Sequence, residues 1–157
     1  MKRAAGPEPA APACPLCAGD GGELVWRSDR LRVILAAEPD YPGFTRVVWQ
    51  AHLAEMTDLA APERDTLMRV VFTVESAQRD ALAPDKVNLA SFGNMVPHLH
   101  WHVIPRWRDD RHFPEPVWGR AAAGRDDAIA ARRAATQARV PAYLDLLRAR
   151  LAGDARA

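Results

Sequence analysis

The 157-residue sequence contains no uninterrupted apolar run that approaches the ~20 residues needed to span a bilayer, and its charges are balanced. The 21 basic and 20 acidic residues are interspersed and give a formal net charge of +1. Because this balance provides no sequence-wide attraction to polyanions, long nucleic acid is not an expected partner. Residues 1–13 lack the apolar segment of a secretory signal. We therefore expect a disordered N-terminal tail on a cytoplasmic protein that does not bind membranes.

Cysteine is scarce, since Cys14 and Cys17 are the only two in the chain. A redox pair with this Cys-x-x-Cys spacing requires a helix start in a thioredoxin-like βαβ context, which is missing, and a structural disulfide is disfavoured in the cytoplasm. The same spacing allows two thiolates to share one tetrahedral zinc ion, provided that two further ligands are available. Zinc binding and a pair of unligated thiols are the two interpretations that remain.

The pattern of apolar residues predicts a single α+β domain with a mainly antiparallel sheet of about five strands. Three runs rich in strand-forming residues predict strands over Glu23–Trp26, Leu31–Leu35 and Thr45–Trp49. Apolar residues at helical spacing after Pro62 predict one long helix, packed on the sheet, that ends near Leu82. The apolar face Leu67–Ala77 of this helix is also consistent with burial against a partner subunit.

The last two strands are expected to form a hairpin that contains three of the five histidines. Asn88–Phe92 is the first arm, and Gly93-Asn94 is a turn signal. In the second arm, His98, His100 and His102 alternate with apolar residues, so their rings should lie on one face of the sheet.

The region after the hairpin is expected to be irregular at first and then helical. Arg106–Pro116 mixes charges, aromatic residues and prolines, which indicates an irregular segment over the sheet edge. Helices are predicted over Arg125–Val140 and Pro141–Leu151, the second ending at Gly153.

Three histidines on one strand face suit phosphoryl or nucleotidyl transfer. A neutral imidazole nitrogen is nucleophilic near pH 7, and a neighbouring ring can stabilise phosphate charge or protonate a leaving group. The alternatives are a structural strand that is rich in histidine and a metalloenzyme in which all three rings bind one catalytic metal. The strand has no Asp or Glu to act as a base, and alternate residues of one strand converge poorly on one ion, so the catalytic metal is disfavoured.

The run His98-Leu99-His100-Trp101-His102-Val103-Ile104 resembles the His-x-His-x-His-x-x motif of the histidine triad (HIT) superfamily of nucleotide hydrolases and transferases. The resemblance is strongest to the bacterial branch related to diadenosine tetraphosphate hydrolases. It implies a HIT domain over residues 14–116 and a helical C-terminal extension over 117–157. It also implies a homodimer that cleaves a small-molecule nucleotide at its α-phosphate, either a dinucleoside polyphosphate, a nucleoside phosphoramidate or an adenylylated acid.

The resemblance also assigns roles to individual residues. It makes His100 the nucleophile that forms a covalent nucleotidyl intermediate, and it places His102 against the phosphate and the leaving group. Asn88 and Asn94 match positions that bind the substrate. Met95 stands where many relatives carry a Ser or Thr, and a methionine cannot donate the corresponding hydrogen bond. A zinc-stabilised nucleotide-binding protein with little or no turnover is therefore the alternative function.

The zinc-containing relatives use a Cys-x-x-Cys pair, a histidine after the third strand and the first histidine of the triad. The corresponding residues here are Cys14, Cys17, His52 and His98. The resemblance thus implies one structural zinc that joins the N-terminal segment to the catalytic strand, and it implies no organic cofactor.

Overall fold

The computed structural model describes residues 14–154, which contain one five-stranded antiparallel sheet. The order of the strands is β1-β2-β3-β5-β4, and each strand is antiparallel to its neighbours. The strands are β1 (Glu23–Arg27), β2 (Leu31–Leu35), β3 (Thr45–Trp49), β4 (Lys86–Ala90) and β5 (His100–Arg106). The predicted α+β class and the largely antiparallel sheet are confirmed.

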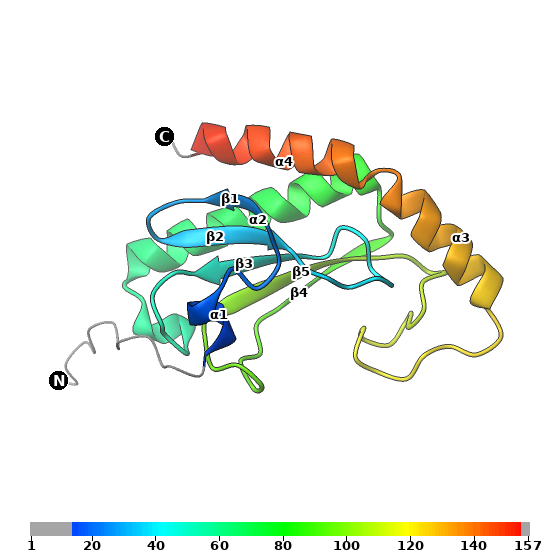
Figure 1. The fold of residues 1–157 in the computed structure, drawn as a ribbon, viewed down its shortest axis with the longest axis horizontal. Coiled ribbons are helices and arrows are strands. Elements are labelled where there is room, and N and C mark those ends of the chain that lie inside the picture. Colours follow the sequence, from blue (N-terminus) through cyan, green and yellow to red (C-terminus); the bar gives the residue numbers. More distant parts are fainter. Residues whose placement is uncertain (1–13, 155–157) are drawn as a thin grey trace.

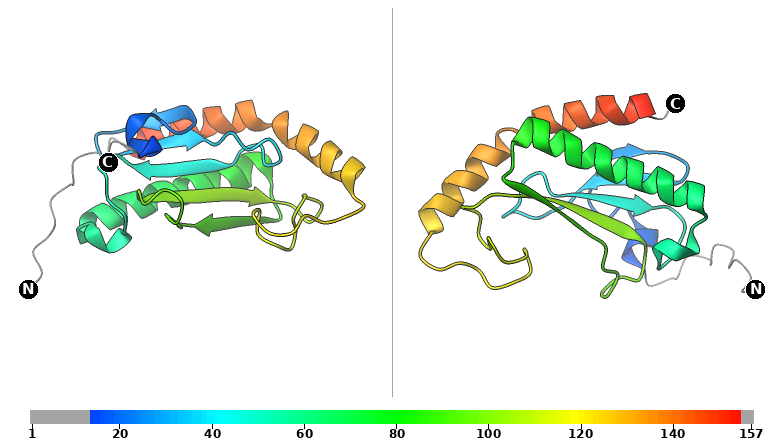
Figure 2. Two further views of the ribbon diagram at one scale, coloured as in Figure 1. Left: turned by 60° about the horizontal axis from the view of Figure 1, so that its bottom comes forward. Right: turned by 180° about the vertical axis from the view of Figure 1, so that it is seen from behind.

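Two helices cover one side of this sheet (Figure 1). The long helix α2 (Ala61–Leu82) packs against β3, β4 and β5, and α4 (Val140–Asp154) packs against α2 and β1. The short α1 (Pro15–Ala18) precedes β1, and α3 (Asp126–Gln137) leads into α4 (Figure 2). Within residues 14–154, none of the helices has both the length and the apolar character of a membrane span.

Strand alternation separates the core from the open face of the sheet. Val33, Val47 and Val103 are fully buried and belong to the core cluster that includes α2 and α4. Successive side chains of a strand point to opposite faces, so Arg46 of β3 and His102 of β5, which are direct cross-strand partners, lie on the other side. The open face of the sheet therefore carries the polar residues.

The apolar face of α2 does not need a partner subunit. Leu67, Val71, Val74 and Ala77 are fully buried within the single chain. They pack against the sheet and against residues of α4 such as Leu147. The interpretation of this face as an interface is wrong, because α4 already covers it.

The predicted tight hairpin is a longer connection in the structure. β4 ends at Ala90 and β5 begins at His100, so residues 91–99 form a loop and His98 lies outside the strand. Pro97 has no N–H to donate to a strand partner, and the backbone N–H of His98 donates locally to the carbonyl of Val96 at 2.8 Å. The pairing of β4 with β5 ends at Ala90 and His102, and the N–H of His98 is satisfied within the loop.

The two predicted C-terminal helices exist, but their ends differ from the prediction. The first is shorter than predicted, and α4 continues through Gly153 to Asp154. Tyr143, Leu147 and Leu151 of α4 are fully buried in the main core, which makes this helix an integral part of the fold. The predicted disordered tail over residues 1–13 lies outside the described residues, and the division at residue 116 stays a prediction.

Candidate functional site

His100 and His102 line a hollow of about 590 Å³ on the open face of the sheet. Arg46 reaches this hollow from β3, and the 91–99 loop contributes Asn94 and Met95. The side chain of Met95 is 94% exposed. The structure thus brings Asn94 together with the two histidines that were predicted to be catalytic.

The hydrogen bond of His100 fixes its tautomer. Its Nδ1 lies 2.6 Å from the backbone carbonyl oxygen of His98. A carbonyl only accepts, so Nδ1 carries the hydrogen and Nε2 retains the lone pair. Burial lowers the pKa of His100, and the nearby Arg46 acts in the same direction, although the bond to the His98 carbonyl opposes them. His100 therefore presents a neutral, nucleophilic Nε2 at pH 7.

His102 lies in an aromatic surround next to His100. The centroid of its ring is 4.7 Å from that of His100 and 5.6, 5.9 and 5.3 Å from those of Phe44, Phe92 and Trp118. Burial, with smaller contributions from His100 and Arg46, lowers the pKa of His102 to about 3. The ring is therefore neutral at pH 7, with one N–H and one lone pair, and its Nδ1 is buried without a hydrogen-bond partner among residues 14–154.

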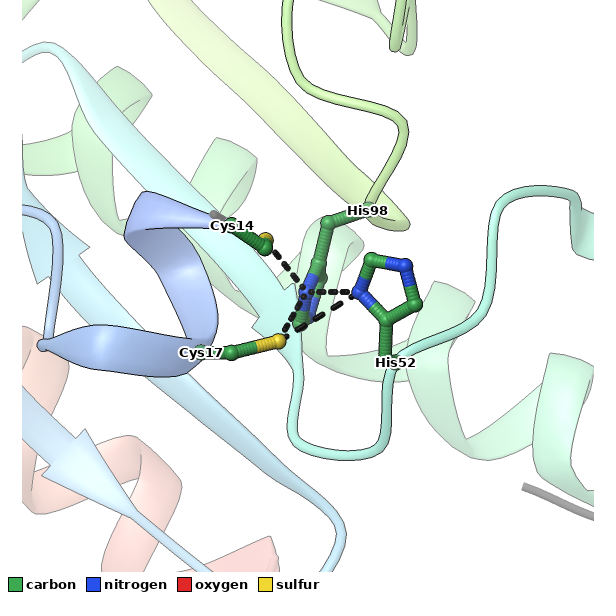
Figure 3. Close-up of side chains that lie close together, drawn as sticks. All are labelled: Cys14, Cys17, His52 and His98. Carbon is green, nitrogen blue, oxygen red and sulfur yellow. Dashed lines mark hydrogen bonds between the residues drawn. The ribbon is translucent and has the colours of Figure 1, made fainter. Parts of the chain in front are cut away.

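A second cluster joins both cysteines to His52 and His98 (Figure 3). Cys14 precedes α1 and Cys17 lies within it, and the backbone N–H of Cys17 donates to the Cys14 carbonyl at 3.0 Å. This turn directs both sulfurs towards the two histidines. Nδ1 of His98 lies 3.5 Å from Sγ of Cys14, 3.4 Å from Sγ of Cys17 and 3.4 Å from Nδ1 of His52.

The geometry of these four side chains suits a tetrahedral metal ion. Zinc bonds of about 2.3 Å to sulfur and 2.0–2.1 Å to nitrogen place the ligand atoms of a tetrahedron roughly 3.3–3.8 Å apart. The separations between the ligand atoms of Cys17, His52 and His98 are 3.3–3.4 Å, close to that range, and all four ligand atoms lie within 4.8 Å of one another. In addition, Nε2 of His98 donates to the Trp49 carbonyl at 2.7 Å, which leaves Nδ1 unprotonated for the metal. The cluster can hold a metal ion.

Asn88 lies on the same face of the sheet as His102, two residues along β4 from Ala90, the cross-strand partner of His102. Its Oδ1 accepts a hydrogen bond from Nη1 of Arg106 at 2.8 Å. It lines a second hollow, of about 570 Å³, that shares Phe92 and Trp118 with the histidine hollow. The expected role of Asn88 in substrate binding stays a prediction.

The sequence did not indicate the buried ion pair that organises the segment after β5. Arg106 and Asp110 are 2% and 3% exposed, and Nε of Arg106 donates to Oδ2 of Asp110 at 2.6 Å. Asp110 Oδ1 also accepts hydrogen bonds from the backbone N–H groups of His112 and Phe113. The pair thereby shapes the segment that brings Trp118 against His102. The i, i+4 spacing of Arg106 and Asp110 was the signal available in the sequence.

Asp110→Asn is expected to lower the free energy of unfolding by about 3–5 kcal/mol, because it leaves the buried Arg106 charge without its partner. Asp109→Asn is the matched control. Asp109 pairs with Arg132 at 2.8 Å but is 42% exposed, so its loss should cost at most about 1 kcal/mol. Urea unfolding of both variants measures the difference. Equal losses would contradict a special role for the buried pair.

Comparison with known proteins identifies related sequences. The HIT domain family model matches residues 21–109, more than half of the chain. An uncharacterised HIT-like protein of Saccharolobus solfataricus is 29% identical over 96 residues, which cover 58% of this chain and 69% of that protein. An AP-4-A phosphorylase of Mycobacterium tuberculosis is 27% identical over 111 residues, which cover 67% of this chain and 57% of that protein. The match thus spans little more than half of the phosphorylase.

Solved structures of histidine triad proteins share the fold. One from Bradyrhizobium japonicum is 26% identical, with a TM-score of 0.59 over 77% of this chain and 92% of that one. One from Marinobacter aquaeolei is 24% identical, with a TM-score of 0.61 over 82% and 94%. A Zn-bound histidine triad family protein from Mycobacterium smegmatis is 24% identical, with a TM-score of 0.52 over 79% and 93%. The family model and the fold agree: this chain belongs to the HIT domain family.

Proposed function

We propose that this protein cleaves small-molecule nucleotides at the α-phosphate, with His100 as the nucleophile. The observation that carries the proposal is the 2.6 Å contact between Nδ1 of His100 and the His98 carbonyl, which leaves the Nε2 lone pair free. The hollow that His100 lines is large enough for a nucleotide, and a second neutral histidine lies beside it. The AP-4-A phosphorylase relative supports a dinucleoside polyphosphate as one substrate.

The reaction has two steps in this proposal. Nε2 of His100 attacks the α-phosphorus, a P–N bond forms, and the bond from phosphorus to the leaving oxygen or nitrogen breaks, a leaving nitrogen taking a proton that His102 relays from solvent. The N–H of His102 stabilises the phosphoryl oxygens and the leaving atom as charge develops on them. An acceptor molecule then attacks the same phosphorus, the P–N bond breaks, and the proton of the acceptor passes to the departing His100 ring or to solvent.

The acceptor in the second step distinguishes two reactions. We propose water, which makes the protein a hydrolase. The relative named as an AP-4-A phosphorylase favours inorganic phosphate as the second candidate. The two acceptors compete for the same nucleotidyl-His100 intermediate, so the first step is common to both reactions.

Incubation with diadenosine tetraphosphate in ¹⁸O-labelled water, with and without inorganic phosphate, tests the proposal. Hydrolysis is expected to give ATP and AMP that carries one ¹⁸O atom, and the yield should not depend on phosphate. Phosphorolysis would instead give ATP and ADP, only when phosphate is present. An AMP-phosphoramidate, assayed in parallel, tests a different leaving group. Binding of AMP without turnover of either compound would favour the alternative, a nucleotide-binding protein with little or no activity.

We further propose that the metal held by Cys14, Cys17, His52 and His98 is zinc and that its task is structural. All four positions of a tetrahedral ion would be occupied by protein ligands, so the ion would have no open position for substrate. Bound there, it would link α1 and the chain after β3 to the loop before β5. The homodimer that the family resemblance implies is likewise a proposal, and sedimentation at micromolar concentration would test it.

A further inference from the structure

Arg46 is the charged residue of the histidine hollow. Of the described residues that line this hollow, it is the only Arg, Lys, Asp or Glu. It is the second residue of β3 and the direct cross-strand partner of His102. Side chains at directly opposite positions of an antiparallel pair have their Cβ atoms about 4.5–5.5 Å apart and interact. Arg46 therefore brings a permanent positive charge next to the two proposed catalytic rings.

The guanidinium of Arg46 is only partly used by the protein. Nη2 lies 3.3 Å from Oε1 of Glu38, a carboxylate whose side chain is 38% exposed, and the group lies over the ring of Phe44 at 5.4 Å from its centroid. Nε is buried and has no hydrogen-bond partner among residues 14–154. A buried donor without a partner is costly, so the guanidinium of Arg46 is not fully satisfied by its contacts with Glu38 and Phe44.

The neighbouring groups provide little else for an anion. Met95 has no hydrogen to donate, and the Nδ1–H of His100 is committed to the His98 carbonyl. A phosphate ester in this hollow carries negative charge that these groups do not neutralise. A guanidinium, with its planar set of donors, is the side chain best suited to phosphate oxygens.

We propose that Arg46 binds the α-phosphate of the nucleotide and that Glu38 holds the guanidinium until the nucleotide arrives. This inference rests on the proposed function, because it assumes that a nucleotide occupies the histidine hollow. Arg46 is then a further substrate-binding residue that neutralises the phosphate while His100 attacks. Glu38 competes with the phosphate for the same guanidinium and opposes anion binding.

The test is the ratio of the affinities for AMP and adenosine, measured by titration calorimetry on the full-length, metal-loaded protein. The ratio cancels the contributions of base and ribose and isolates the phosphate. Arg46→Gln is expected to lower the ratio about ten- to a hundredfold, as for the loss of a charged hydrogen-bonding group. Arg46→Lys should lower the ratio less than Arg46→Gln does, because lysine keeps the charge but loses the planar set of donors. Glu38→Gln should raise it.

A matched control is Arg27→Gln. Arg27 lies at the end of β1, pairs with Asp20 and does not line the hollow. Its ratio should equal that of the unaltered protein. An unaltered protein that binds AMP no better than adenosine would overturn the proposed function itself. If the unaltered protein prefers AMP but Arg46→Gln retains that preference, only the role of Arg46 is overturned. A Glu38→Gln ratio below that of the unaltered protein would overturn the competition between Glu38 and phosphate.

Discussion

Replacement of His100 by glycine is expected to abolish turnover while nucleotide binding survives. The nucleophile forms the covalent bond but supplies few contacts to the ground state, so its loss affects kcat far more than affinity. Removal of a nucleophile typically lowers kcat by roughly 10⁴-fold or more. Steady-state rates with a dinucleoside polyphosphate, together with calorimetric titration of AMP, measure the two effects separately.

Rapid-quench mass spectrometry provides the direct check, because the unaltered protein should form a nucleotidyl adduct on the peptide that contains His100. The His100→Gly protein should form none. Near-normal turnover by this variant without added imidazole would contradict the mechanism, and an adduct on His98 or His102 would reassign the nucleophile.

His102→Asn is the matched comparison on the same strand face. A donor to the leaving atom matters only when that atom needs a proton, so this variant should slow substrates with poor leaving groups more than those with good ones. His100→Gly, in contrast, should affect both kinds of substrate to the same extent. Because burial lowers the pKa of His102 to about 3, the ring acts as a neutral N–H donor before substrate binds. A phosphate anion beside it would raise that pKa and so increase the population of the protonated ring, the form that can give a proton to a leaving atom.

Local patterns predicted most of the secondary structure, whereas the details of the catalytic face depend on long-range pairing. Period-two alternation correctly placed His100 and His102 on one face of β5. It failed for His98, because β5 begins at His100 and the N–H of His98 is satisfied within the loop. The position of His98 is set instead by its contact with the Trp49 carbonyl, which no local pattern encodes.

Arg46 shows most clearly what a single sequence leaves open. A charged residue inside the run Thr45–Trp49 indicates only that one face of the strand is less buried than the other. Its position next to His102 follows from the pairing of β3 with β5, two strands about 55 residues apart in the chain. Asn88 depends on the same kind of pairing, since β4 and β5 together place it on the face of His102, where its Oδ1 accepts a hydrogen bond from Arg106.

Loss of a metal ligand is expected to have a large effect on stability. Cys17→Ala or His52→Ala should abolish the binding of about one zinc per chain and lower the melting temperature by on the order of 10 °C. The free energy of binding a structural ion is folding free energy, because the four ligands come together only in the folded chain. Activity per folded molecule should fall much less, since neither residue lines the histidine hollow. Metal analysis by mass spectrometry, thermal unfolding and rates corrected for the folded fraction measure these effects.

His112→Ala is the matched control for His52→Ala, because His112 lies outside the cluster and contacts Tyr41 instead. It should retain the metal and lose little stability. His98→Ala should resemble loss of the cysteines, with instability as the dominant effect, even though His98 is only two residues from the nucleophile in the sequence.

If freshly purified, well-folded protein contains no zinc, the zinc assignment is wrong. If a chelator removes the metal and the protein keeps both its fold and its activity, the ion is not structural. Activity that disappears on metal removal from a protein that stays folded, and returns with added metal, would instead indicate a catalytic ion.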